Sequence, residues 1–238
     1  MIFHSQFCLA VHSMKDLPTE DTEGLRVGAV IKREDPSDLL LIREDAYNGD
    51  SYLKLSSNSK VGTSSLRRMA QIKNAMKSLD VLPLRGNVPT RVKKLRDGNF
   101  DAIIIAKAGI KRLEIDLGGL KSLTLPFSFF LPSPSQGALA LQIRDNDSIA
   151  GTIKALNHED TEKAVTAERN FLKYFGGGCH VPIGALAYMN EGVIHLTGSV
   201  TSTDGDKTLR ADIAGSDPEI IGKELAELLK SKGADKLL

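Results

Sequence analysis

Basic side chains recur at points where a predicted strand gives way to a predicted helix. The first such segment, residues 61–68 (VGTSSLRR), places hydroxyls and backbone N–H groups at a helix start and Arg67 and Arg68 in the first turn. Cations there oppose the helix dipole, and a bound anion would remove the conflict because helix N-termini bind anions. The alternative interpretation is a serine cap followed by two exposed arginines.

Two further segments repeat this design. In residues 84–91 (LRGNVPTR), Arg85 lies at a strand's carboxyl end and Arg91 in the first turn of the next helix, and the strand at 101–106 leads to Arg112. In parallel sheets, ligands bind outside the carboxyl ends of the strands, so the basic ends are expected to meet at one crevice. Because arginine pairs with carboxylates through two parallel hydrogen bonds, a ligand with several carboxylates is the predicted occupant.

Asp16 is a candidate for electrostatic catalysis. It lies in residues 10–19 (AVHSMKDLPT), where a short apolar strand runs into a polar cluster that ends at a proline. One interpretation is an ordinary surface pair with Lys15, which would contribute little. In the other, Asp16 faces the basic crevice, stays ionised among the arginines and stabilises a cationic species.

Cys179 is a candidate for covalent chemistry. Three glycines precede it and His180 follows it, an arrangement that could lower the pKa of the thiol. It is either a reactive or modified thiol or a buried structural one. With Cys8 as the only other cysteine, neither a disulfide framework nor a zinc site is predicted, and the sequence indicates no metal site.

The elements that must position these residues fall into two groups. Alternating strands and helices from about 61 to 106 predict a parallel sheet with right-handed crossovers. After a boundary near 149–157, the pattern predicts a separate small α+β unit. Its predicted elements are a helix from about Thr161 to Phe175, strands near 183–189, 193–201 and 207–214, and a helix from Pro218 to about Lys232.

Composition narrows the class of protein. The 238 residues are 41% hydrophobic and 26% charged, no apolar run is long enough to span a bilayer, and no signal peptide is predicted, so a cytosolic protein is expected. The net charge is +1, yet residues 60–112 hold thirteen Lys/Arg and three Asp/Glu, or +10, which leaves −9 elsewhere. This indicates an anionic partner or a solvated basic face. Nucleic acid is a poor match, because Phe100 is the only aromatic residue in this stretch.

Seven segments, taken in chain order, resemble the porphobilinogen deaminase (hydroxymethylbilane synthase) family: AVHSMKDLPT, VGTSSLRR, LRGNVPTR, AGIKRL, SQGALALQ, AERNFL and GGCHVPIG. The resemblance covers nearly the whole chain. It implies an α/β and α+β fold with two lobes like those of periplasmic binding proteins and a small C-terminal α+β domain with a three-stranded antiparallel sheet. The implied domains are residues 1–34 with 132–150, residues 35–131, and residues 151–238.

The resemblance also implies a function. Family members condense four porphobilinogen molecules stepwise, with release of ammonia, into hydroxymethylbilane for tetrapyrrole and heme biosynthesis. The implied protein is a cytoplasmic monomer without nucleic-acid or membrane partners, and its dipyrromethane cofactor is joined by a thioether to Cys179. Asp16 would be the catalytic carboxylate that assists deamination. Cofactor binding would fall to Ser13, Lys15, Thr63, Ser65, Arg67, Arg68, Arg85 and Gly86, and substrate binding to Arg85, Arg91, Arg112 and Gln136, the last near a hinge.

Two departures from the family pattern are visible. Family members begin upstream of the AVHS strand, so the first lobe is expected to lack its N-terminal part and one substrate-binding arginine. Ser135 stands where the family usually has glycine. An inactive relative that only binds pyrrole carboxylates is therefore the alternative function.

Overall fold

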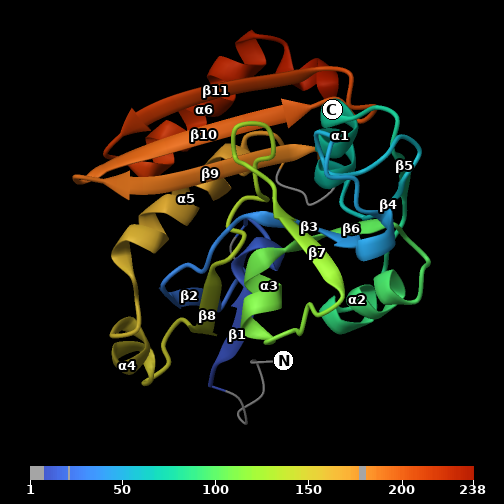
Figure 1. Ribbon diagram of the computed structural model, residues 1–238. Helices are drawn as coiled ribbons and strands as arrows, with labels where there is room; N and C mark the ends of the chain where they lie inside the picture. Colours follow the sequence, from blue (N-terminus) through green and yellow to red (C-terminus); the bar gives the residue numbers. More distant parts are fainter. Residues whose placement is uncertain (1–7, 21, 177–180) are drawn as a thin grey trace.

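The computed structural model describes residues 8–20, 22–176 and 181–238 and arranges them around three β-sheets (Figure 1). The first sheet is antiparallel, with the order β1–β8–β2. Its strands are β1 (Ala10–Ser13), β8 (Leu139–Arg144) and β2 (Leu25–Val30). The central strand comes from a much later part of the chain than its neighbours, so the chain leaves this sheet after β2 and returns through β8.

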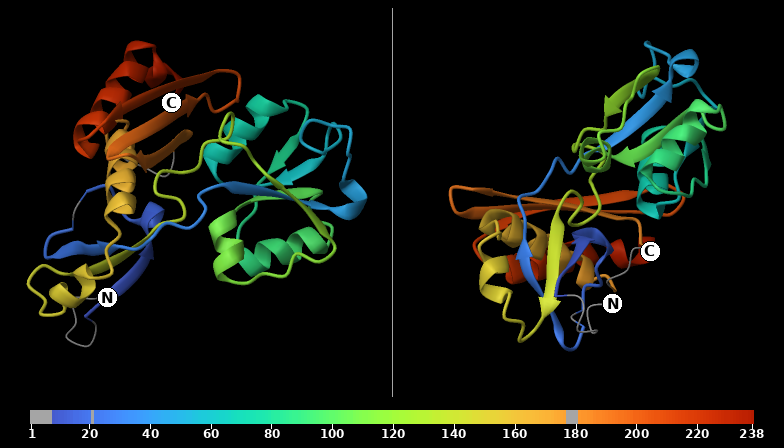
Figure 2. Two further views of the ribbon diagram at one scale, coloured as in Figure 1. Left: turned by 60° about the vertical axis from the view of Figure 1, so that its left-hand side comes forward. Right: turned by 90° about the horizontal axis from the view of Figure 1, so that it is seen from below.

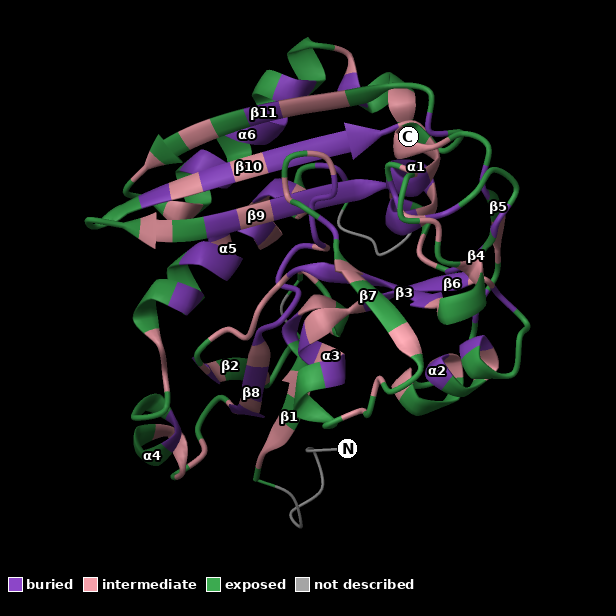
Figure 3. Cartoon of the chain, in the orientation of Figure 1, coloured by how far each residue is buried: buried purple, intermediate pink, exposed green. Residues whose placement is uncertain are grey.

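The second sheet has five strands in the order β5–β4–β6–β3–β7. They are β3 (Asp38–Arg43), β4 (Lys60–Gly62), β5 (Asp80–Leu82), β6 (Ala102–Ala106) and β7 (Leu120–Thr124). The predicted parallel arrangement is confirmed for β4, β5 and β6. The sheet as a whole is mixed, because β3 runs antiparallel to both β6 and β7. The prediction missed β3, whose apolar run is buried between two strands (Figure 3).

The helices predicted to follow β4 and β5 are present. They are α1 (Leu66–Ala75) and α2 (Val88–Arg96), and a short helix, α3 (Lys107–Arg112), follows β6. The Ser65 side chain caps α1 by accepting a hydrogen bond from the Arg68 N–H, and Asn87 caps α2 in the same way. Helix α1 packs through Ile72 on one face of the sheet and α2 through Leu95 on the other.

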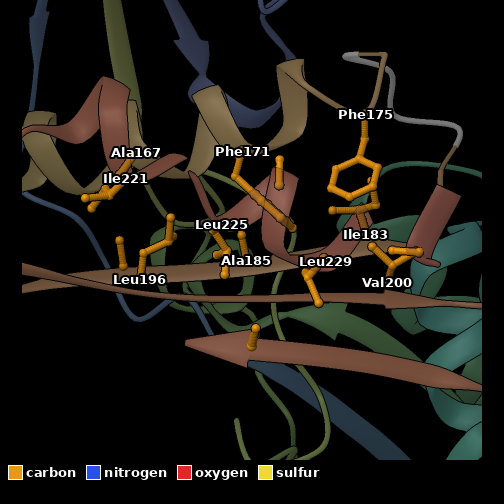
Figure 4. Packing of buried hydrophobic residues seen from close by; sticks show 14 of the residues in the cluster. Ala167, Phe171, Phe175, Ile183, Ala185, Leu196, Val200, Ile221, Leu225 and Leu229 are labelled. Atoms are coloured by element: carbon orange, nitrogen blue, oxygen red, sulfur yellow. The ribbon is translucent and has the colours of Figure 1, made fainter. Parts of the chain in front are cut away.

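The third sheet is antiparallel, with the order β11–β10–β9, as the hairpin signals predicted. Its strands are β9 (Ile183–Asn190), β10 (Val193–Thr201) and β11 (Thr208–Gly215), and the helices of this part are α4 (Ala150–Lys154), α5 (Glu159–Lys173) and α6 (Pro218–Ser231). Helices α5 and α6 bury Phe171 and Leu225 against the sheet (Figure 4). A side chain at Gly198 would meet both, so glycine permits this close approach.

Short 3-10 helices complete the fold: η1 (Met14–Asp16), η2 (Glu44–Ala46) and η3 (Ala234–Leu237). In the described part of the chain, no helix combines the length and the apolar character that a bilayer crossing requires. The predicted fold class, α/β with a C-terminal α+β part that contains a three-stranded antiparallel sheet, is confirmed.

Two connections cross between the first and second sheets, one before β3 and one after β7 (Figure 2). They are hydrogen-bonded to each other: the Glu34 N–H donates to the Gly137 carbonyl at 3.0 Å, and Gln136 Nε2 donates to the Pro36 carbonyl at 2.7 Å. Gly137 has φ +88°, and a Cβ there would lie 2.4 Å from the Glu34 carbonyl oxygen, so only glycine fits. These paired connections hold the first and second sheets together, so that residues of η1, α1 and α5 line one cavity.

Candidate functional site

A polar cavity of about 390 Å³ lies where these elements meet. Seven of the residues that sequence patterns or the family resemblance singled out line it: Lys15, Asp16, Ser65, Arg67, Arg68, Arg91 and Gln136. Its other described lining residues are Ser64, Ser133, Pro134, Leu172, Val181 and Ile183. The cavity therefore receives side chains from parts of the chain that belong to all three sheets and their helices.

The arginine pair at the start of α1 is buried rather than exposed. Arg67 and Arg68 keep only 4% and 5% of their surface accessible. Their counter-charge is Asp38, the first residue of β3, which sequence patterns did not identify. Arg67 Nη2 lies 2.8 Å from Asp38 Oδ2, and Arg68 Nη2 lies 2.6 Å from Asp38 Oδ1. The interpretation of two exposed arginines is wrong, because a neighbouring strand supplies an internal anion.

Asp38 is ionised despite complete burial. Desolvation opposes its charge, but the charges of Arg67 and Arg68 and the hydrogen bond from Gln136 outweigh burial and hold the pKa of Asp38 at about 2. The only sequence signal for this residue is an acid at the head of an apolar run, DLLLIR. Such a residue is equally typical of a strand end facing solvent.

Lys15 faces the same cluster from η1. Its ammonium lies 3.5 Å from Gln136 Oε1, which also lies 3.5 Å from Arg68 Nη2. Burial, followed by the charge of Arg68, lowers the pKa of Lys15 from 10.5 to about 8. Burial and the charge of Arg68 also lower the pKa of Arg91. Cations crowded in this way are stabilised by a bound anion.

Asp16 lies at the rim of the cavity and is exposed. The turn that carries it is tied to α5 through Arg169, whose guanidinium donates to the carbonyls of Met14 at 3.3 Å and Leu17 at 3.1 Å, and also to that of Pro18. Sequence patterns did not identify Arg169, although it lies in the AERNFL segment. These contacts fix the position of Asp16 relative to the cavity.

Other predicted residues lie outside the cavity lining. Arg85 and Gly86 are exposed, and the Gly86 carbonyl accepts a hydrogen bond of 2.7 Å from Arg91 Nε. Arg112 Nη2 donates to the Gly137 carbonyl at 2.7 Å. The predicted convergence of three basic strand ends therefore holds for α1 and for Arg91, whereas it is wrong for Arg85 and Arg112, which are not among the residues that line the cavity.

Three predicted residues remain. Ser13 is exposed at the end of β1, next to η1. Thr63 is buried, and its Oγ1 accepts a hydrogen bond from the Ser65 N–H at 3.2 Å. Cys179 lies outside the described residues.

A second buried ion pair supports the connection on which Gln136 lies. Glu168 of α5 is fully buried and accepts hydrogen bonds from Arg33 at 2.6 Å and from the Ser135 N–H at 2.5 Å. Ser135 itself has φ +63°, and its buried Oγ has no hydrogen-bond partner among the described residues. This backbone conformation is one that glycine adopts readily.

The donor set suits a ligand with several carboxylates. Four cations line one cavity: Lys15, Arg67, Arg68 and Arg91. Asp38 is paired with Arg67 and Arg68 and neutralises part of this charge, and the exposed Asp16 also lines the cavity. A cavity of this kind is what a protein that binds polycarboxylate ligands within a mixed α/β fold requires.

Comparison with known proteins agrees with this class. Residues 1–151 match the family model "Porphobilinogen deaminase, dipyromethane cofactor binding domain", and residues 162–231 match "Porphobilinogen deaminase, C-terminal domain". The porphobilinogen deaminase of Carboxydothermus hydrogenoformans is 43% identical over 235 residues, which cover 97% of this chain and 73% of that protein. The enzyme of Moorella thermoacetica is 45% identical over 233 residues, with 97% and 72% covered.

This chain belongs to the porphobilinogen deaminase family. It is thus a transferase of tetrapyrrole biosynthesis with a dipyrromethane cofactor. Among solved structures, a periplasmic binding protein of an ABC transporter from Brucella ovis, with glutathione bound, is 17% identical at a TM-score of 0.37, covering 66% of this chain and 46% of that one. That similarity is too weak to support an inference.

Proposed function

We propose that this chain joins four porphobilinogen molecules in succession to give hydroxymethylbilane. Each addition breaks the substrate's carbon–nitrogen bond and the α carbon–hydrogen bond of the terminal pyrrole, forms a carbon–carbon bond, and releases ammonia and a proton. After the fourth addition, water breaks the bond to the cofactor, which releases the tetrapyrrole with the water's hydroxyl. The observation that supports this reaction is the meeting of Lys15, Arg67, Arg68 and Arg91 in one cavity with Asp16 at its rim. Porphobilinogen carries an acetate and a propionate, so the bound pyrrole chain gains two negative charges with each addition.

The cations bind these side arms. Each charge-assisted hydrogen bond contributes about 1.5–3 kcal/mol net, so several together hold a polycarboxylate firmly. Arg91 is only partly buried. It lies in the first turn of α2 and lines the cavity, where it can reach an incoming substrate. Lys15, with its lowered pKa, is stabilised in its charged form by a bound carboxylate.

Asp16 is the proposed catalytic carboxylate. It lies beside Lys15 and is held in place through the contacts of Arg169 with the η1 turn. An ionised carboxylate in that position stabilises positive charge that develops on a substrate ring as ammonia departs. The exposed rim leaves room for the leaving amine.

Cys179 is the proposed attachment point of the cofactor. Val181, two residues further along the chain, lines the cavity, which supports this role. The dipyrromethane, when bound through the Cys179 sulfur, supplies the terminal pyrrole carbon to which the first substrate is joined. Tethering makes each addition intramolecular.

The other predicted roles stay proposals. Ser13, Thr63, Ser65 and Gly86 would assist cofactor binding, and Arg85, Arg112 and Gln136 would complete the cofactor- and substrate-binding set. The proposed domains are residues 1–34 with 132–150, 35–131 and 151–238, with Gln136 near the hinge. We also propose a cytoplasmic monomer without nucleic-acid or membrane partners.

The test is direct. Purified protein incubated with porphobilinogen should release ammonia and form a product that oxidises to uroporphyrin, and intact mass under denaturing conditions should show the surplus of a dipyrromethane. Cys179→Ser should lose this surplus.

Asp16→Asn should keep the dipyrromethane mass while turnover falls more than 100-fold. The control is the remote Asp97→Asn, in an exposed pair with Lys93, which should change neither the mass nor the turnover. Near-normal turnover of Asp16→Asn would refute the role of Asp16.

A further inference from the structure

Asp38 occupies a position that the sheet topology creates. Strand β3 is antiparallel to β6, and Asp38 is paired in register with Ala106, the last residue of β6. The first residue of β3 therefore lies at the end of the sheet where the parallel strands β4 and β6 have their carboxyl ends. Helix α1 starts at that same end of the sheet, so the Asp38 carboxylate meets Arg67 and Arg68 in the first turn of α1.

The carboxylate connects both arginines to a glutamine. Its Oδ1 accepts hydrogen bonds from Arg68 Nε at 3.1 Å, Arg68 Nη2 at 2.6 Å and Gln136 Nε2 at 3.0 Å, while its Oδ2 accepts from Arg67 Nη2 at 2.8 Å. These contacts satisfy a fully buried charge, which would otherwise be very costly to bury.

Each guanidinium has a second fixed contact. Arg67 Nη1 donates to the Leu131 carbonyl at 2.7 Å, and its guanidinium lies 5.7 Å from the centre of the Phe130 ring. Arg68 Nη1 donates to the Ile104 carbonyl at 3.1 Å. Both terminal nitrogens of Arg67 and all three guanidinium nitrogens of Arg68 thus donate to protein acceptors. The orientation of each guanidinium is therefore set before any ligand arrives, and the remaining N–H bonds of the terminal nitrogens can serve the ligand.

We propose that Asp38 is a positioning residue that holds Arg67 and Arg68 in the orientation in which they receive the carboxylates of the pyrrole ligand. Its role rests on the proposed function, but it acts through the arginines and does not itself contact the ligand. It lowers the positive charge of the cavity by one. Charge alone therefore predicts that removing Asp38 tightens anion binding, whereas positioning predicts the opposite.

This difference in sign gives the experiment. Citrate is a tricarboxylate that cannot react. It is titrated into the full chain carrying Cys179→Ser, so that no attached dipyrromethane occupies the arginines, and this same background is used for the wild-type reference and for every variant in the titration. The dissociation constant is obtained from the shift of the thermal unfolding midpoint, and turnover is measured separately with Cys179 in place. Asp38→Asn keeps the side chain's size and removes its charge. We expect it to bind citrate about tenfold more weakly than the wild type, a change of about 1.4 kcal/mol. Asp38→Glu restores the charge one methylene further out and should recover part of the loss.

The matched control is Asp97→Asn, which removes one negative charge from the exposed surface of the second-sheet region and should leave citrate affinity within twofold. Equal or tighter citrate binding by Asp38→Asn would overturn the proposal, as would a wild type that does not bind citrate. If Asp38→Asn fails to fold, Asp38→Glu decides: citrate affinity equal to that of the wild type would also overturn it.

Turnover separates this proposal from the proposed function. A wild-type chain that binds citrate but does not release ammonia from porphobilinogen would contradict the proposed reaction. The comparison of citrate affinity between wild type and Asp38→Asn would still test the positioning role of Asp38. In an active chain, Asp38→Asn should lower kcat/KM at least tenfold, with partial rescue by Asp38→Glu.

Discussion

Two buried regions of the molecule differ in chemistry: the core of the C-terminal sheet is apolar, whereas the buried cluster at the start of α1, beside the second sheet, is charged. In the C-terminal part, Phe171, Leu225 and Leu229 pack the helices onto the strands in an apolar core (Figure 4). At the end of the second sheet, Arg67 and Arg68 are also buried, but they are charged and paired with Asp38. Apolar burial stabilises a fold in proportion to area, whereas a buried ion pair gains little over its desolvation cost.

The comparison teaches which region is built for stability and which for binding. The C-terminal core should determine the free energy of unfolding and have little influence on anion affinity. The arginine cluster should determine affinity and contribute less to stability. Substitutions in the two regions should therefore separate stability from anion affinity.

Phe171→Ala should have the largest effect on stability. The ring is fully buried and packs edge-on against Phe175 with 5.4 Å between ring centroids, so its removal leaves a cavity that the two helices cannot close. The expected loss is about 3–5 kcal/mol in the free energy of unfolding, measured by urea denaturation. Citrate affinity of the remaining folded protein should be unchanged. A large drop in that affinity would contradict the division.

Arg67→Met should give the reverse pattern. Asp38 keeps Arg68 and Gln136, so the loss of stability should be about 2 kcal/mol, below that for a fully orphaned buried charge. Citrate or porphobilinogen affinity should fall more than tenfold, because one fixed guanidinium is gone. The matched control is Arg96→Met, on the exposed face of α2. Unchanged affinity in Arg67→Met would show that Arg67 is purely structural.

Lys15 should make anion binding depend on pH. Its ammonium has a pKa of about 8 in the folded protein against the ordinary 10.5, so the unfolded chain holds a proton that the folded chain lacks between these values. Lys15 therefore makes stability rise with pH across that window. A carboxylate binds the protonated form, so citrate affinity should fall about tenfold, or about 1.4 kcal/mol, as pH rises through 8 to 10.

The control is Lys15→Met, in which this part of the pH dependence should vanish. Citrate itself is fully ionised throughout the range, so its own titration does not interfere. An undiminished pH dependence in Lys15→Met would assign the titration to another group.

Ser135→Gly should have the smallest effect, and in the stabilising direction. It relieves a positive φ and removes a buried hydroxyl that has no partner among the described residues, at the expense of a more flexible unfolded chain. The expected net gain is about 1 kcal/mol in the free energy of unfolding. Ser135→Ala removes the hydroxyl but keeps the strained φ, so it should gain less. A destabilised Ser135→Gly would show that the hydroxyl has a role in the native state.

Local patterns were sufficient for much of the fold. The serine cap of α1, the glycine after α2 and the hairpin turns of the C-terminal sheet act over a few residues, so their consequences could be read along the chain. Strand β3 was missed although a turn signal, Asp35-Pro36-Ser37, precedes it, because a short continuous apolar run does not by itself distinguish a buried strand from a buried helix segment.

The ordered motifs in the amino-acid sequence were enough to indicate the family and to place arginines at the strand–helix junctions. What those arginines contact depends on the three-dimensional arrangement of the strands. Asp38, which lies nearly thirty residues before Arg67, reaches it because β3 runs antiparallel to β6. A buried charge is stable only beside its partner, and which partner arrives depends on strand order, a long-range property that no local pattern encodes.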